Sequence, residues 1–192
     1  MPDIATPQMV RHFWLDTLTE KQWYVADDAV DTAIRTQFAA TWEAARGGAC
    51  RDWLFCAQDA LAYLILVDQF PRNMFREDPR AFATDDLAVA ATRLMLDQGW
   101  DHDVAGAAKQ FVYMPLMHSE TLAEQDLAIA LFEERMPGTP NTRHAYAHRW
   151  VIAAFGRFPY RNEVLGRETT PDEQIFLDNG GYRFALEQIP VD

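Results

Sequence analysis

Lysine is nearly missing from this chain of 192 residues. Fifteen of its seventeen basic residues are arginine, and the only lysines are Lys21 and Lys109. Acidic residues number twenty-nine, which leaves a formal net charge of −12 at pH 7. A protein that binds a phosphate backbone or an anionic membrane by charge needs a basic surface. The composition therefore excludes nucleic acid and membrane lipid as expected partners.

Cysteine and long apolar runs are also scarce. Cys50 and Cys56 lie six residues apart, and no Cys-x-x-Cys pair is present to hold a structural zinc ion. The longest apolar run, Ala60 to Val67, has eight residues, whereas a membrane-spanning helix needs about 20. Met1 to Trp14 lacks the basic and apolar segments of a signal peptide. We therefore expect a cytoplasmic protein without a transmembrane helix, disulfide or metal.

Glycine-rich phosphate loops are absent as well. The chain has no Gly-x-Gly-x-x-Gly, no Gly-Lys-Ser/Thr and no Gly-x-Ser-x-Gly elbow. These are the common signatures of nucleotide-binding proteins and hydrolases. The sequence thus predicts no cofactor, and it leaves open whether the protein is an enzyme.

Apolar residues recur at helical spacing over most of the chain, as Val30, Ile34 and Phe38 do. No stretch alternates with the period of two that marks a half-buried strand. Four signals mark helix starts: Thr6-Pro7, Asp27, Thr84 with Asp85-Asp86, and the capping box Thr170-Pro171-Asp172-Glu173. The sequence predicts an all-α fold of about eight helices in antiparallel pairs.

Prolines shape the expected helices in the middle of the chain. We predict one helix from Arg51 to about Gln69, stopped by Pro71. We predict that Pro115 breaks or kinks the chain before a long helix from Leu116 to Arg135. A buried strand over the apolar run is the alternative to the first helix. The helical period begins well before that run and favours helix.

One pattern occurs twice. Phe70-Pro71-Arg72-Asn73 is followed by an apolar residue and Arg76, and Phe158-Pro159-Tyr160-Arg161-Asn162 is followed by Leu165 and Arg167. The two copies start 88 residues apart, and each follows an apolar helix and precedes a capped one. We therefore expect equivalent corners in a single domain over residues 1–192, with two quasi-equivalent halves left open.

Two interpretations of these corners stay open. Arginine and asparagine just beyond a helix end can satisfy its unpaired carbonyl groups. Alternatively, the guanidinium fork can bind a carboxylate or phosphate, which lysine does only as a point charge. The arginines concerned are Arg72, Arg76, Arg80, Arg157, Arg161 and Arg167. They either close helix ends or bind a small anion.

Histidines and carboxylates supply further candidates. His118 and Glu120 are two residues apart, so only a kinked turn brings them together. His144 and His148 have the spacing of two metal ligands on one helical face, with Glu120 or Asp68 as a third ligand. No motif supports a metal there, and the structural interpretation is the stronger one. Asp68 ends the apolar helix, so we expect an arginine to pair with it.

The longer motifs resemble a known bacterial family. They are Leu66 through Arg76, Phe82-Ala83-Thr84-Asp85, Tyr113 through Glu120, His148, Phe155 through Asn162 and Leu165-Gly166-Arg167. From Phe13-Trp14 to Phe176-Leu177 the chain resembles the family known as domain of unknown function 924. The resemblance implies a tetratricopeptide-like α-α superhelix and no established activity. Tyr160 departs from the family pattern, which commonly has histidine there.

The matching polar positions suggest a site. We predict a pocket lined by arginine, histidine and glutamate for a small anionic ligand. The candidates for catalysis are His118, Glu120 and His148. The candidates for ligand binding are Asp68, Arg72, Asn73, Arg76, His118, Glu120, Arg157, Arg161, Asn162 and Arg167, and Gln69 and Ser119 also match the motif.

The alternative hypothesis is a helical-repeat scaffold without catalytic activity. Such a scaffold binds a peptide or a protein in a concave groove. It predicts exposed aromatic side chains along one face, such as Trp23, Tyr24 or Trp100.

Overall fold

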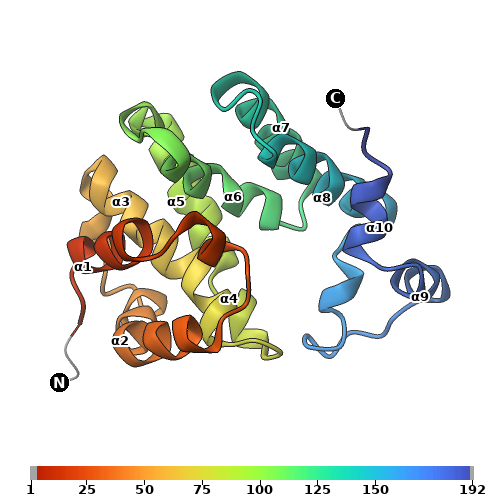
Figure 1. The fold of residues 1–192 in the computed structure, drawn as a ribbon, viewed down its shortest axis with the longest axis horizontal. Coiled ribbons are helices and arrows are strands. Elements are labelled where there is room, and N and C mark those ends of the chain that lie inside the picture. The colour runs from red at the N-terminus through yellow and green to blue at the C-terminus, as the bar shows by residue number, and fades with distance from the viewer. Residues whose placement is uncertain (1–3, 191–192) are drawn as a thin grey trace. The chain divides into compact units, whose positions relative to one another are not determined.

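The computed structural model describes residues 4–190. Within this range the regular structure is helical throughout and contains no strand, which confirms the all-α class. The chain divides into two compact units, Met1–Pro115 and Leu116–Asp192. Figure 1 colours the first from red to green and the second from teal to blue. No helix in the described range is long and apolar enough to cross a membrane.

The first unit packs its helices around an aromatic core. The ring of Phe70 contacts the rings of Trp14 and Phe38 at centroid distances of 5.7 and 4.8 Å, and Trp14 also contacts Phe111. Helix α1 packs on α3, α2 on α4, and α3 on α5. The bounds are α1 Pro7–Arg11, α2 Asp28–Arg46, α3 Ala57–Leu64, α4 Phe70–Met74, α5 Asp85–Asp97 and α6 Gln110–His118.

Two predicted helix starts in this unit have the expected caps. The Thr6 side chain accepts a hydrogen bond from the Met9 N–H, and Asp27 accepts from Ala29 and Val30. Thr84 is the N-cap residue of α5 as predicted, but its side chain makes no capping hydrogen bond. Its hydroxyl donates to the Val67 carbonyl and accepts from the Trp42 indole, so it ties three segments together.

The predicted helix from Arg51 to Gln69 is wrong at both ends. Cys56 is extended, with φ −151° and ψ 158°, and separates a 3-10 turn from α3. Pro71 does not stop the helix. The residues before it, Ile65–Gln69, form a π-helical turn, and Pro71 opens α4, where a missing N–H costs little. The helix ends at Met74 instead, with Phe75 as its C-cap.

The second unit holds its own core. Val151, Ile152, Phe158, Phe176 and Ala185 form a buried cluster. Helix α8 packs against both α7 and α10. The bounds are α7 Leu122–Arg135, α8 Asn141–Phe155, α9 Pro171–Asp178 and α10 Tyr182–Glu187, with a 3-10 turn at Pro159–Arg161.

The predicted helix from Leu116 to Arg135 is two helices. Helix α6 contains Pro115 and continues to His118, and a break over Ser119–Thr121 separates it from α7. The capping box before α9 is confirmed, since Thr170 and Glu173 bond reciprocally to the backbone. Helix α10 follows where the sequence predicted no further helix.

The two Phe-Pro copies differ in backbone structure. The first runs through helix α4 and the two residues after it, whereas the second follows the end of α8 at Gly156, which has φ 70°. In the second copy Pro159 opens the 3-10 turn. The prediction of equivalent corners is therefore wrong. A π-helical turn carries the first copy through its proline, whereas a left-handed glycine ends the helix before the second.

Candidate functional site

The first Phe-Pro copy clamps a buried aspartate. Asp31 lies in the first turn of α2 with 5% of its surface exposed. Arg76 binds it through Nε and Nη2 at 2.5 and 3.0 Å, and Asn73 Nδ2 donates to it at 2.8 Å. Three donors thus satisfy this carboxylate, which would be costly to bury unpaired.

Asp68 pairs with an arginine, as predicted. It is 1% exposed and lies 3.2 Å from Arg72 Nη1, which also donates to the Asp68 carbonyl at 2.5 Å. Gln69 donates to the second carboxylate oxygen. The other arm of Arg72 donates to Asp85, in the first turn of α5, at 2.9 Å. Arg72 therefore joins two carboxylates of the first unit.

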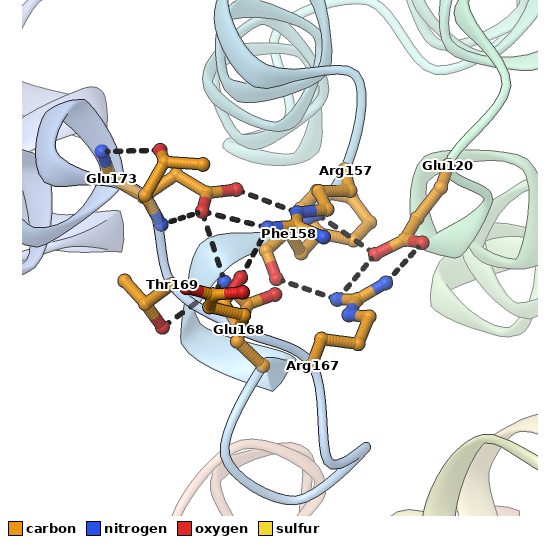
Figure 2. A network of polar contacts seen from close by, with 9 residues as sticks. Glu120, Arg157, Phe158, Arg167, Glu168, Thr169 and Glu173 are labelled. Carbon is orange, nitrogen blue, oxygen red and sulfur yellow. Dashed lines mark hydrogen bonds and ion pairs between the residues drawn. The ribbon is translucent and has the colours of Figure 1, made fainter.

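In the second unit Glu120 clamps the start of the second copy (Figure 2). It accepts from the Phe158 N–H at 2.8 Å and from both terminal nitrogens of Arg167 at 2.8 and 3.1 Å. Burial raises the pKa of Glu120, but the bonds from Arg167 and Phe158 outweigh burial and hold that pKa below its usual range. Glu120 is therefore a fixed carboxylate rather than a proton donor at neutral pH.

Glu173 forms the second carboxylate of this network (Figure 2). It is 2% exposed and lies in the first turn of α9. Arg157 binds it at 2.6 and 2.8 Å, Asn162 donates at 3.2 Å, and the Thr170 N–H donates at 2.8 Å. The Arg157 hydrogen bonds lower the pKa of Glu173 to about 2. The carboxylate therefore remains charged over the physiological pH range.

These contacts favour the structural interpretation for most of the predicted binding residues. Each of four arginines binds a carboxylate within its own unit, and Asn73 and Asn162 bind two of the same carboxylates. The four are Arg72, Arg76, Arg157 and Arg167. Arg80 likewise pairs with Asp78, two residues before it in the sequence. That the predicted binding residues of the first unit and those of the second share one cleft stays a prediction.

Arg161 lies in a different environment. It is 7% exposed, and its guanidinium lies 4.4 Å from the centre of the Phe158 ring. Its Nη2 donates to the His118 carbonyl at 3.0 Å. Arg161 thus ties the 3-10 turn after α8 to the last residue of α6.

Aromatic and imidazole rings gather beside Arg161. His148 is central: its ring centre lies 6.1 Å from His118, 5.3 Å from Phe158 and 4.8 Å from Tyr182. Tyr160 stacks on Phe158 at 5.3 Å. The six rings that we call the ring cluster are His118, His144, His148, Phe158, Tyr160 and Tyr182. The ring cluster brings together two of the predicted catalytic candidates, His118 and His148.

A hydrogen bond fixes one side of the ring cluster. His144 Nδ1 lies 2.6 Å from the Tyr182 hydroxyl, and the two rings stack. Burial and the nearby Arg143 lower the pKa of His144, and burial raises the pKa of Tyr182. Both groups are therefore neutral at pH 7. In this bond one neutral group donates its proton and the other accepts it, according to the tautomer of the imidazole.

Arg143 lies beside this pair. Its Nη2 donates to the Leu186 carbonyl at 3.0 Å, and its Nε is buried without a hydrogen-bond partner. Within residues 4–190 no carboxylate forms an ion pair with it. The sequence did not single out Arg143, and only the i,i+4 spacing of His144 and His148 pointed to this face of α8.

The structure gives the other candidates simpler roles. Ser119 Oγ accepts a hydrogen bond from the Thr121 N–H and so shapes the break before α7. No group of three or more histidine, cysteine, aspartate or glutamate side chains in the described residues is arranged to hold a metal ion. Of the aromatic residues that the scaffold hypothesis names, Tyr24 is exposed, whereas Trp23 and Trp100 are half-buried.

Comparisons with known proteins agree with the resemblance seen in the sequence. The model of a family described as a bacterial protein of unknown function (DUF924) matches residues 10–181. A solved structure of a protein of unknown function from Agrobacterium tumefaciens, ATU0120, is 35% identical, with a TM-score of 0.86. The match covers 91% of this chain and 97% of that one. No curated protein matches. The chain belongs to the bacterial family of unknown function DUF924.

Proposed function

We propose that the unit Leu116–Asp192 binds a small anionic molecule at the ring cluster. One observation carries this proposal: five titratable rings are linked by pairwise contacts, and two of them, His144 and Tyr182, lie near Arg143, a guanidinium that no carboxylate of the described chain neutralises. Arg157 and Arg167 are each balanced by a glutamate. The charge of Arg143 is therefore available to an anion.

The donors around the ring cluster suit a compact anion. A guanidinium supplies directed N–H donors, and imidazole and phenol rings add N–H and O–H donors. The phenol of Tyr182 stays protonated because burial raises its pKa. An overall charge of −12 disfavours polyanions, so a single small anion fits better than a polymer.

The paired residues then serve as support. Glu120 with Arg167, and Glu173 with Arg157 and Asn162, brace the segment that carries Phe158, Tyr160 and Arg161. Such bracing holds binding groups in place at little entropic cost when a ligand arrives. If the ligand is also chemically converted, His148 is the candidate acid or base, since its ring contacts three others of the cluster.

We also propose a cytoplasmic location. Cys50 and Cys56 are both free thiols in the structure, as is usual in a reducing compartment.

The proposal can be tested by NMR of the imidazole groups during titration with inorganic phosphate. We expect saturable shifts of the His144 and His148 ring signals in the wild type. Arg143→Gln removes the charge and should weaken binding about tenfold, since a hydrogen bond to a charged group contributes about 1.5–3 kcal/mol. Arg149→Gln is the matched control, because Arg149 lies on the same helix in an exposed ion pair with Asp126.

Two results would contradict the proposal. One is the absence of saturable shifts with phosphate. The other is equal phosphate affinity in wild type and Arg143→Gln, with both proteins folded as judged by circular dichroism. Arg143→Lys keeps the charge and should retain part of the affinity, which separates loss of charge from loss of packing.

A further inference from the structure

The first unit contains an open cavity of about 660 Å³, a volume within the range of small-molecule sites. It lies between the 3-10 turn Arg51–Phe55, helix α3, helix α5 and the turn at Trp100. None of its lining residues belongs to the two carboxylate clamps of this unit or to the ring cluster. The cavity is therefore a separate candidate site.

The floor of the cavity is one face of α5. Leu87, Ala91 and Leu94 recur at helical spacing along it, and Ala90 lies beside them at the surface. Alanine side chains end at Cβ, so two of them in this row leave space that larger residues would fill. The spacing that made α5 amphipathic therefore also produces an apolar trough.

Arg51 is the one charged residue among those that line the cavity. In a chain with twenty-nine acidic residues, no aspartate or glutamate lines it. Within residues 4–190 the Arg51 side chain makes no hydrogen bond or ion pair. The cavity thus combines apolar walls with one uncompensated guanidinium.

Gly48 makes room for this guanidinium. It has φ 84°, and a Cβ built there would lie 3.2 Å from Arg51 Nε and 3.4 Å from its Nη2. The Arg51 head group therefore rests against the backbone of Gly48, in the turn that follows α2.

Two aromatic residues complete the surroundings. Tyr63 is buried at the cavity wall, and burial raises the pKa of its phenol, which stays protonated as a donor. Phe55 lies at the rim with 80% of its surface exposed. A large exposed aromatic ring beside an apolar cavity gains burial when an apolar ligand enters.

We propose that this cavity binds a small carboxylic acid with an apolar body. The carboxylate pairs with Arg51, and the alkyl or aryl body lies along the α5 trough under Phe55. A neutral molecule of the same shape lacks the charge-assisted bond. A polyanion is disfavoured, because the cavity offers it only one cation among apolar walls. The proposal does not depend on the ring cluster, which belongs to the other unit.

The test is isothermal titration calorimetry of the full chain with sodium octanoate, and with octan-1-ol as the neutral probe of equal length. We expect one saturable site for octanoate. Octanol should bind about tenfold more weakly, because it lacks the charge-assisted hydrogen bond to Arg51. Arg51→Gln should bring the octanoate affinity to that of the alcohol. Arg46→Gln, a nearby exposed arginine paired with Glu43, is the control and should leave it unchanged.

A second variant tests the body of the ligand. Ala90→Phe fills the trough from an exposed position, so the protein should fold while octanoate binding is lost. The proposal is overturned if octanoate shows no saturable binding, if the alcohol binds as tightly as the acid, or if Arg51→Gln or Ala90→Phe binds octanoate like the wild type. Because none of these variants lies in the second unit, a failure here leaves the phosphate titration of the ring cluster unaffected.

Discussion

Both units bury a carboxylate that hydrogen-bond donors surround, but the donors lie on different backbone structures. In the first, Asn73 and Arg76 bind Asp31 from a helix and the residues just after it. In the second, Asn162 and Arg157 bind Glu173 from a loop and a 3-10 turn. In both, an amide and a guanidinium share one carboxylate in the first turn of a neighbouring helix.

The two units share a buried carboxylate that an amide and a guanidinium bind together. A carboxylate in the first helical turn is favoured by the helix dipole and by free backbone N–H groups. Burying it costs several kcal/mol unless donors surround it. In the first unit the motif supplies both kinds of donor, Asn73 and Arg76. In the second unit it supplies Asn162, whereas the guanidinium comes from Arg157, the residue just before the motif. The second unit, in addition, places the ring cluster beside its clamp.

The first prediction concerns the clamp around Glu173, which is more deeply buried than Asp31. Glu173→Gln should lower the free energy of unfolding by about 3 kcal/mol, because it leaves Arg157 and Asn162 without their shared acceptor charge. It also weakens the capping box of α9. Urea unfolding followed by circular dichroism measures the loss. Glu163→Gln, an exposed glutamate in the same segment, is the control, and equal stability of the two variants would contradict the structural role.

The second prediction weakens the corresponding clamp of the first unit. Asp31→Asn should cost about 1–2 kcal/mol, less than Glu173→Gln, because Arg76 is 45% exposed and water can solvate it once the charge is gone. The same urea titration measures it, with the exposed Asp97→Asn as control. A cost at Asp31 that exceeds the cost at Glu173 would mean that side-chain exposure does not rank the two clamps.

Sequence patterns anticipated the local features of this fold well. Thr6, Asp27 and Thr170 begin helices because their side chains bond to nearby N–H groups, which a sequence can reveal. The effect of Pro71 was not predictable in this way. Whether a proline ends a helix depends on the turn before it, and the π-helical turn at Ile65–Gln69 has no residue signature.

The partners of the polar side chains also divide into those that the sequence predicted and those that it did not. The pairing of Asp68 with an arginine was predicted, since Arg72 lies one helical turn away. Asp31 was not identified as a partner of Arg76, because they lie 45 residues apart and Asp31 resembles an ordinary first-turn acid. In the ring cluster, the spacing of His144 and His148 gave a signal, whereas Tyr182 comes from a helix that the sequence did not predict.

The last prediction uses acid to test the clamp around Glu173. The pKa of Glu173 is lowered from 4.5 to about 2 by the hydrogen bonds of Arg157. A carboxyl whose folded pKa lies below its unfolded value stabilises the folded state fully above the unfolded pKa. That contribution is lost as the pH falls from about 4.5 towards 2. Wild-type stability should therefore decrease in this window, as measured by urea unfolding at pH 6, 4 and 3.

Wild type is compared with Glu173→Gln, because the glutamine side chain does not take up a proton in this pH range. The variant should lose less stability than the wild type between pH 6 and 3, so the two curves converge as the pH falls. Glu163→Gln should run parallel to the wild type. If the Glu173→Gln curve also ran parallel, the proton would bind Glu173 equally in the folded and unfolded chain. Its hydrogen bonds to Arg157 would then contribute nothing to folding, and burial of a paired carboxylate would not be the property that the two units share.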